Sequence, residues 1–238
     1  MKILQLSYSL SSGGGERFVV DLCNRLSENP QNEVILLTTD DDRNSKNVHY
    51  LGDVSSKVRY INLHSQSGCH TLYRYDSKKD TLVDGKVIAD FPLTDSVMLN
   101  YKGHDLLFST FIPDSNGNTL SIYERKGDDL KYNKVDEVTF DSRIARMAGD
   151  FFEVNGKLYR PAQDCNKEYG NAVIIQEASC DSNGKWHFKS VRRRTSPHPI
   201  LKRGFHTLNH YNGLIVIDVK GYRYPKIGKM LESIRHFF

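Results

Sequence analysis

The sequence predicts a mainly β protein: a partial β-propeller of about three blades, preceded by a small α/β segment that is Rossmann-like. From residue 69 onward, short runs rich in Val, Ile, Tyr and Phe alternate with Gly, Asn and Asp, as in successive antiparallel strands. A degenerate repeat accompanies them. Asp95-Ser96 and Asp141-Ser142 open units 46 residues apart (141 − 95), and a third unit begins near Gly204. A period in the forties with several strands per unit is typical of propeller blades.

Composition limits the classes of partner and cofactor. The formal net charge of +4 is too small for the concentrated basic face of a dedicated nucleic-acid binder, so we expect no nucleic-acid partner. The four cysteines form no Cys-x-x-Cys pair and have no ligand-like His spacing, which predicts a reduced, cytoplasmic chain without a metal site or cofactor. No run approaches 18 apolar residues, so we expect no integral membrane segment.

Residues 1–66 form the predicted α/β segment. Apolar runs at 2–6, 33–39 and 58–63 indicate buried strands, and residues 16–26 have the apolar spacing of an amphipathic helix. The glycines at 13–15 lie between the first strand and the helix, where backbone N–H groups suit a phosphate or a sugar-linked anion. Three strands and one helix are too few to cover both faces of a parallel sheet, so this segment should depend on the rest of the chain or remain partly disordered.

The opening motifs resemble the start of a family 4 glycosyltransferase with the GT-B fold. They are Lys-Ile-Leu-x-Leu, the loop Gly-Gly-Gly-Glu-Arg and the strand Asn-Glu-Val-Ile-Leu-Leu-Thr-Thr. The resemblance implies that Gly14, Gly15 and Glu16 face a ligand cleft. Nothing after residue 66 resembles the second half of those enzymes, which holds the nucleotide sugar, so we expect no intact donor site.

Residues 69–221 form the predicted β domain. Expected strands lie at 71–75, 96–101, 105–111, 119–124, 147–154, 157–160, 172–177 and 214–218. Asn155-Gly156 supplies the two positive-φ positions of a tight hairpin between the fifth and sixth of these. The basic run at 189–194 is expected to be a solvated turn, with an anionic contact as the alternative. Trp186 is expected to be a packing residue.

Polar residues gather at the ends of this hairpin. Asp141, Arg143 and Arg146 precede it, and Arg160, Gln163 and Asp164 follow it. Guanidinium, amide and carboxylate groups at fixed angles suit a hydroxyl-rich ligand, and Tyr169 offers an aromatic face for a sugar ring. The alternative is that these groups are surface ion pairs and turn caps.

Several motifs of this region resemble those of a carbohydrate-active propeller when taken together. They are Ala-Arg-x-Ala-Gly at 145–149, Gly-x-Leu-Tyr-Arg-Pro-Ala-Gln-Asp at 156–164, Tyr169-Gly170, Gly-Phe-His-Thr-Leu-Asn at 204–209 and Ile-Val-Ile-Asp at 215–218. The resemblance covers about residues 70–220. It is to the N-terminal domain of plant glucosamine inositolphosphorylceramide transferases and their bacterial relatives, which is similar to the five-bladed propellers of family 43 glycoside hydrolases.

This resemblance implies a central funnel that is reached by the first residues of each repeat. Asp95 and Asp141 are then the candidate general acid and base, with His206 beside them. His206 has three readings: a metal ligand, a general base or, by default, a core histidine. The sequence does not give the separation of the two carboxylates, and we rank hydrolysis below binding or transfer.

The resulting prediction is a protein of glycan or glycoconjugate biosynthesis that binds or transfers a sugar, nucleotide sugar or glycoconjugate. It is related to glycosyltransferases, and whether it is an enzyme stays open. The alternatives are a non-catalytic binding module, a truncated fusion without activity, and a hydrolase-like protein. Unclosed strand edges predict self-association. Residues 222–238 have the spacing of an amphipathic helix that docks on the domain or contacts a membrane peripherally.

Overall fold

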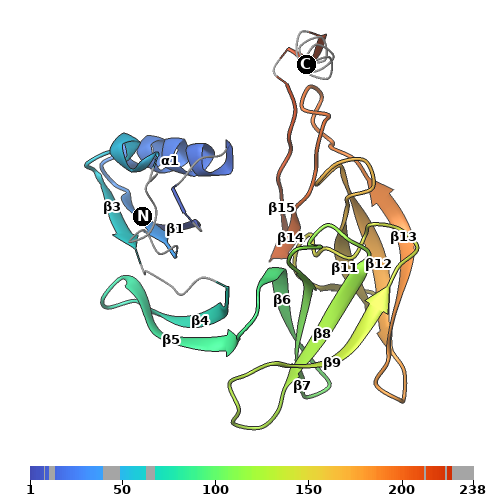
Figure 1. The fold of residues 1–238 in the computed structure, drawn as a ribbon. Coiled ribbons are helices and arrows are strands. Elements are labelled where there is room, and N and C mark those ends of the chain that lie inside the picture. The colour runs from blue at the N-terminus through green and yellow to red at the C-terminus, as the bar shows by residue number, and fades with distance from the viewer. Residues whose placement is uncertain are drawn as a thin grey trace. The chain divides into compact units, whose positions relative to one another are not determined.

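The computed structural model describes residues 1–7, 9–10, 14–39, 49–62, 68–211, 213–222 and 224–226. The described part is mainly β, as predicted, with fifteen strands, one α-helix and one 3-10 turn (Figure 1). The chain divides into two compact units, Met1–Asp90 and Phe91–Phe238. No helix among the described residues is long and apolar enough to span a bilayer.

The first unit contains a three-stranded parallel sheet and a helix. Its elements are β1 (Lys2–Ser7), α1 (Gly14–Ser27), β2 (Glu33–Thr38), the 3-10 turn (Leu51–Asp53) and β3 (Val58–Asn62), and the strand order is β1-β2-β3. Val20 and Cys23 on the apolar face of α1 pack with Val34 and Leu36 of β2. The predicted alternation of strand, helix and strand is therefore confirmed.

An antiparallel hairpin, β4 (His70–Asp76) and β5 (Thr81–Ala89), completes the first unit. Lys2 Nζ donates a hydrogen bond to the buried Asp80 carboxylate at 2.8 Å and ties the hairpin to β1. The sequence did not predict β5, because Asp84-Gly85-Lys86 interrupts its apolar pattern. Gly85 is required there, since an added Cβ would lie 2.6 Å from the Tyr73 ring. The division by contacts thus falls at residues 90–91, after this hairpin, and differs from the boundary expected at 66–69.

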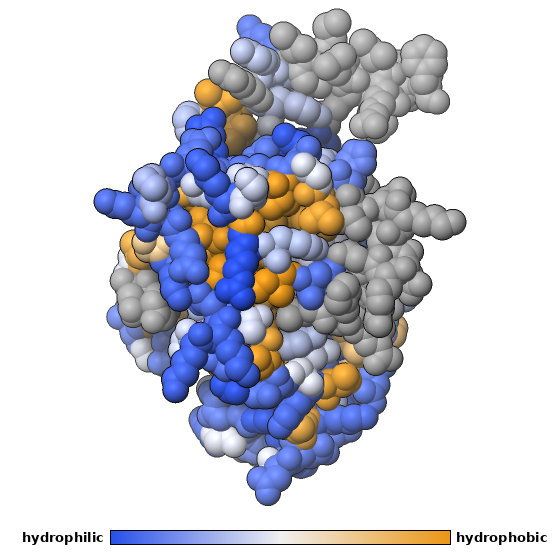
Figure 2. Space-filling model, turned by 90° about the vertical axis from the view of Figure 1, so that its left-hand side faces the viewer, coloured by the Kyte–Doolittle hydropathy of each residue, from blue (hydrophilic) through white to orange (hydrophobic). Residues whose placement is uncertain are grey.

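Apolar side chains remain exposed in the first unit. Leu4 and Leu6 of β1 and Phe18 of α1 belong to this set. Figure 2 views the side on which α1 and β1 to β5 are drawn in Figure 1, and it shows apolar surface among hydrophilic surface. This exposure agrees with the expectation that one helix does not cover a parallel sheet on both faces.

The second unit is built on two four-stranded antiparallel meanders, each with its strands paired in chain order. The first consists of β6 (Leu93–Tyr101), β7 (His104–Phe111), β8 (Thr119–Arg125) and β9 (Asn133–Thr139). The second consists of β10 (Phe152–Val154), β11 (Lys157–Asp164), β12 (Ala172–Cys180) and β13 (Trp186–Arg194). β7, β8 and β9 begin at residues 104, 119 and 133, and β11, β12 and β13 begin at 157, 172 and 186, the same offset of 53 residues each time (157 − 104).

This structural offset differs from the 46 residues that the two Asp-Ser pairs indicated. On the offset of 53, the counterpart of Asp95 in the second meander is Ala148. Asp141 lies in the irregular segment that precedes that meander. The Asp-Ser pairs therefore do not occupy equivalent places, because the connection between β9 and β10 contains no regular strand.

A third hairpin, β14 (Leu208–Tyr211) and β15 (Leu214–Ile217), matches the first two strands of a meander. Tyr211 pairs with Leu214 at its closed end, as Tyr101 pairs with His104 and Val154 with Lys157. Within the described residues, β15 has no strand on its other side. The missing neighbour leaves side chains of β15 exposed. Leu106 of β7 is 6% exposed, whereas Val216, at the equivalent place in β15, is 62% exposed.

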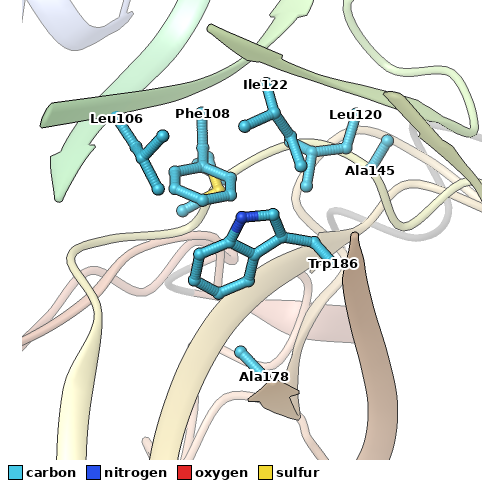
Figure 3. Packing of buried hydrophobic residues seen from close by; sticks show 8 residues of the cluster. Leu106, Phe108, Leu120, Ile122, Ala145, Ala178 and Trp186 are labelled. Atoms are coloured by element: carbon cyan, nitrogen blue, oxygen red, sulfur yellow. The ribbon is translucent and has the colours of Figure 1, made fainter. Parts of the chain in front are cut away.

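The apolar core of the second unit lies between the two meanders. Leu106, Phe108, Leu120 and Ile122 come from the first, and Ala178 and Trp186 come from the second (Figure 3). The Phe108 and Trp186 rings meet edge to face, with centroids 5.0 Å apart. Trp186 is thus a packing residue, as predicted.

Two local expectations need correction. The run at 147–154 is a strand only from Phe152, because the backbone around Ala148 bonds elsewhere: Leu208 N donates to Ala148 O at 2.8 Å, and Asp150 N donates to Asn209 Oδ1 at 3.0 Å. The basic run at 189–194 is no turn but the second part of β13, paired with β12. Most of the predicted terminal helix at 222–238 lies outside the described residues.

Candidate functional site

A polar cluster in the second unit brings together residues from six separate places in the chain. Its members are Asp95, Asn116, Arg146, Gln163, Tyr169 and His206. Arg146 Nε donates to Asp95 Oδ2 at 2.6 Å, and Arg146 Nη1 donates to Asn116 Oδ1 at 2.7 Å. The Arg146 side chain is 13% exposed and the Asp95 side chain 39%, so the carboxylate remains accessible to solvent.

A β-bulge positions Asp95. The pairing of β6 with β7 shifts register between Thr94 and Val97, and Asp95 adopts a φ of 51°. Bulges commonly turn a side chain away from its regular direction, and here the carboxylate reaches residues that follow Asp95 by 51 and 68 positions. The direction of the Asp95 side chain is therefore set by the bulge and not by regular strand geometry.

Gln163 links the carboxylate to the interior of the unit. The residue is 2% exposed. Its Nε2 donates to Asp95 Oδ2 and to the Met147 carbonyl, both at 2.8 Å. Its own backbone N–H donates to the Arg146 carbonyl at 2.8 Å. The Gln163 Oε1 atom is buried and receives no hydrogen bond within the described structure, which leaves one acceptor of the cluster free.

The rings of Tyr169 and His206 extend the cluster. The Arg146 guanidinium carbon lies 4.6 Å from the Tyr169 ring centroid, and the Tyr169 and His206 rings meet edge to face at 5.1 Å. Gly170 permits this contact. It has a φ of +65°, and an added Cβ would lie 2.4 Å from the His206 Cβ.

Asp218 fixes the orientation of His206. His206 Nδ1 contacts the Asp218 carboxylate, which also accepts hydrogen bonds from the backbone N–H groups of His206 and Thr207 at 3.1 and 2.7 Å. Burial alone would raise the pKa of Asp218, but the His206 ring and these two N–H groups outweigh it, so the pKa lies below its ordinary value. His206 is thus a partnered histidine at the edge of the cluster.

Arg160 is placed differently from the expectation. The side chain is 0% exposed, and its guanidinium donates to Gln176 Oε1 at 2.8 Å and to the carbonyls of Ile144 and Ala145. Burial lowers the pKa of Arg160 to about 9, which still leaves the group protonated at neutral pH. All its charge is directed at the protein interior, so we assign Arg160 a structural role.

The other predicted residues lie apart from the cluster. Asp164 is bound by Arg193 Nε at 2.7 Å and by Asn166. The exposed Arg143 forms hydrogen bonds through its backbone, donating to Asn166 and accepting from Cys165 N. Asp141 lines a separate cavity of about 680 Å³ beside Phe140 and Phe188. In the first unit, Gly14 and Gly15 open α1, and Glu16 lies in its first turn.

Two residues were not predicted: Asn116, which belongs to the cluster, and Asp218, which holds His206. Asn116 lies in a polar turn between β7 and β8 and carried no motif. Asp218 ends the Ile-Val-Ile-Asp motif, which supports the family resemblance but did not indicate that this carboxylate contacts His206. Among the described residues, no group of three or more His, Cys, Asp or Glu side chains is arranged to hold a metal ion.

The arrangement has the chemistry of a recognition site. It presents a carboxylate, a guanidinium, two amides and an aromatic ring within one bonded network, a set that suits hydroxyl groups and anions.

Comparison with known proteins gives one family. The sequence matches, over residues 39–206, the family described as glucosamine inositolphosphorylceramide transferase 1, N-terminal. The match covers more than two thirds of the 238 residues, begins before the boundary expected at 66–69 and includes the whole polar cluster. No match was found among curated proteins. The chain therefore belongs to the family of the N-terminal region of glucosamine inositolphosphorylceramide transferase 1.

Proposed function

We propose that this chain serves glycoconjugate biosynthesis as a sugar-recognition domain, in which the polar cluster binds a sugar, nucleotide sugar or glycoconjugate. The observation that carries the proposal is the network around Arg146. This one guanidinium joins Asp95, Asn116 and Tyr169, and the network brings an accessible carboxylate to an aromatic ring. The family name, which is that of a sugar transferase, supports the same class of ligand.

Recognition is favoured over hydrolysis by the positions of the carboxylates. Glycosidases need two carboxyl groups on either side of one bond, about 5–9.5 Å apart. Asp95 is held by Arg146 and Gln163, whereas Asp141 lines a cavity to which Asp95 does not contribute, and this supports binding over hydrolysis. We therefore assign Asp95, Arg146, Gln163, Tyr169 and His206 to binding.

The architecture is part of the proposal. We propose that the two meanders are blades of a partial propeller and that the β14–β15 hairpin begins a third, because each repeats the same pairing at its closed end. We propose that the parallel sheet with α1 corresponds to the start of a GT-B glycosyltransferase, in which Gly14, Gly15 and Glu16 contribute to a cleft. The chain would then recognise a ligand without carrying a full donor site.

Calorimetric titration tests the assignment. The probes are myo-inositol, glucosamine and UDP-glucose, which separate a polyol, an amino sugar and a nucleotide sugar. We expect saturable binding of at least one probe and a loss of at least tenfold in affinity for Arg146→Gln, which removes the bidentate donor. Arg143→Gln, an exposed arginine outside the network, is the control. Equal affinity of the wild type and Arg146→Gln, or no binding of any probe, would remove the assignment.

A further inference from the structure

A cavity of about 470 Å³ lies between the two meanders, at the end of β6 opposite Asp95. Tyr101, Glu124 and Asp136 line it from the first meander, and Cys180, Lys185 and Trp186 line it from the second. Tyr101 follows Asp95 by six positions in β6 (101 − 95), about 20 Å of extended strand. The cavity is therefore distinct from the polar cluster, and the proposed function does not use it.

Asp136 is the unusual residue of this cavity. It pairs across the strands with Ile122, and paired residues of antiparallel strands lie on the same face of the sheet. Ile122 is fully buried in the core between the meanders, so the Asp136 carboxylate is directed toward that interior. An acidic residue at a core-facing position lowers the stability of the fold unless its oxygens receive hydrogen bonds.

Only one of the two Asp136 oxygens has a partner. Oδ1 accepts a hydrogen bond from the Glu137 backbone N–H at 2.8 Å, whereas Oδ2 is buried and receives none within the described structure. A buried acceptor without a donor costs free energy in the absence of a ligand. A ligand in the cavity that donated a hydrogen bond to Oδ2 would remove this cost.

Among the other charged groups of the cavity, Glu124 interacts with His104 and Lys126. Glu124 accepts a hydrogen bond from His104 Nδ1 at 2.7 Å, and Lys126 Nζ lies 3.7 Å from the same carboxylate. Lys185 lines the cavity, but no ion pair joins it to Asp136 in the described part of the chain. Asp136 Oδ2 is therefore the acceptor that a ligand would find free.

The wall of the cavity is aromatic. The Tyr101 and Trp186 rings have centroids 5.1 Å apart, and the Cys180 side chain lies beside them. An aromatic wall next to a single free acceptor suits a small ring that carries a hydrogen-bond donor. We propose that this cavity binds a six-membered ring whose hydroxyl or ammonium group donates to Asp136 Oδ2.

Trp186 provides a direct readout, because it is the only tryptophan of the chain. Its fluorescence is followed while the full chain is titrated with myo-inositol, cyclohexylamine or cyclohexanecarboxylate at neutral pH. The first two probes separate a hydroxyl donor from an ammonium donor, and the third offers a similar ring with an anionic group. We expect a saturable change with at least one donor probe and at least tenfold weaker binding of the carboxylate.

Asp136→Asn is the decisive variant, and Glu137→Gln is its matched control. Glu137 is the next residue and exposed, so its substitution should leave the affinity within twofold of wild type. Asp136→Asn should weaken binding at least tenfold and raise the midpoint of urea unfolding, because the uncompensated carboxylate is removed. Unchanged affinity in Asp136→Asn, or equal binding of all three rings, would overturn the proposal.

Protection of Cys180 supplies an independent measurement on the unaltered chain. A bound ring should slow the reaction of Cys180 with a maleimide at least fivefold, as determined by peptide mass analysis, while Cys69 in the first unit should react at an unchanged rate. Equal Cys180 rates with and without saturating probe would contradict occupancy of the cavity. Arg146→Gln should alter none of these results, because Arg146 does not line the cavity. This variant therefore distinguishes a failure of the cavity proposal from a failure of the proposed sugar recognition by the polar cluster.

Discussion

Arg146 and Tyr169 form a stacked pair in which the guanidinium carbon lies 4.6 Å from the ring centroid. The same guanidinium binds Asp95 at 2.6 Å, so one side chain couples a ring to a carboxylate 74 positions earlier in the chain (169 − 95). This geometry makes Arg146 the residue on which the integrity of the polar cluster depends, and it motivates the first prediction.

A double-mutant cycle with Arg146→Ala and Asp95→Asn should give a coupling energy of about 1 kcal/mol in urea unfolding, because the Arg146 side chain is mostly buried. The Arg74 and Asp84 pair, at 2.7 Å but with both side chains largely exposed, is the control and should couple by about 0–0.5 kcal/mol. Equal coupling in the two cycles would mean that the Arg146 pair is only a surface contact.

Arg160→Ala should destabilise the second unit by about 3–5 kcal/mol, since it empties a buried volume and leaves the carbonyls of Ile144 and Ala145 and the amide of Gln176 without a donor. Urea unfolding followed by circular dichroism measures the loss. Arg143→Ala, at an exposed position, should change stability by less than about 0.5 kcal/mol. A mild effect of Arg160→Ala would contradict the structural role.

The ion pair of Asp164 and Arg193 should make stability depend on pH. Burial would raise the pKa of Asp164, but hydrogen bonds from Arg193 and Asn166 hold it below its ordinary value. The contribution is therefore fully present above about pH 4, the unfolded pKa, and is lost as pH falls through the lower folded pKa. Arg193→Gln should flatten the acid limb of a plot of unfolding midpoint against pH. An unchanged acid limb would show that the pair contributes no linkage.

Within the described residues one side of β15 has no strand, and this edge should promote self-association. Leu214, Ile215 and Val216 are consecutive and exposed, and an unpaired strand edge is a template for another chain. Sedimentation should show a mass that rises with protein concentration, and Ile215→Lys should suppress the rise. Phe18→Lys, which alters an equally exposed apolar residue on a helix, is the control. A constant monomer mass for the wild type would refute this prediction.

Local pattern was enough to predict most strands and the one described helix. The runs at 2–6, 33–39, 58–63, 105–111 and 119–124 are apolar and bounded by turn residues, and each became an element. β5, β9 and β13 were missed because charged residues or glycine occupy much of their length. The residues of these strands show no strong strand pattern of their own. Their strand conformation depends on backbone pairing with β4, β8 and β12.

The candidate site was predicted in part, for a related reason. Arg146, Gln163, Tyr169 and His206 lie in the motifs by which the family was recognised, and the structure joins them. Arg160 lies in the same motif but bonds to Gln176 and to backbone carbonyls of the interior. Residues 160–164 of β11 are buried on both faces, so the alternation of the strand did not predict which side chains join the cluster. The contact of Asp95 with Arg146 depends on the bulge in β6, and no sequence pattern predicted this bulge.

The core shared by Phe108 and Trp186 has a consequence for modularity. The backbone hydrogen bonds of each meander lie within that meander, whereas its buried apolar side chains pack against those of the other meander and of the segment between them, such as Ala145 and Met147. One meander is therefore a complete hydrogen-bonded sheet, but we do not expect it to fold stably by itself. Grafting this fold into another protein would therefore require both meanders together.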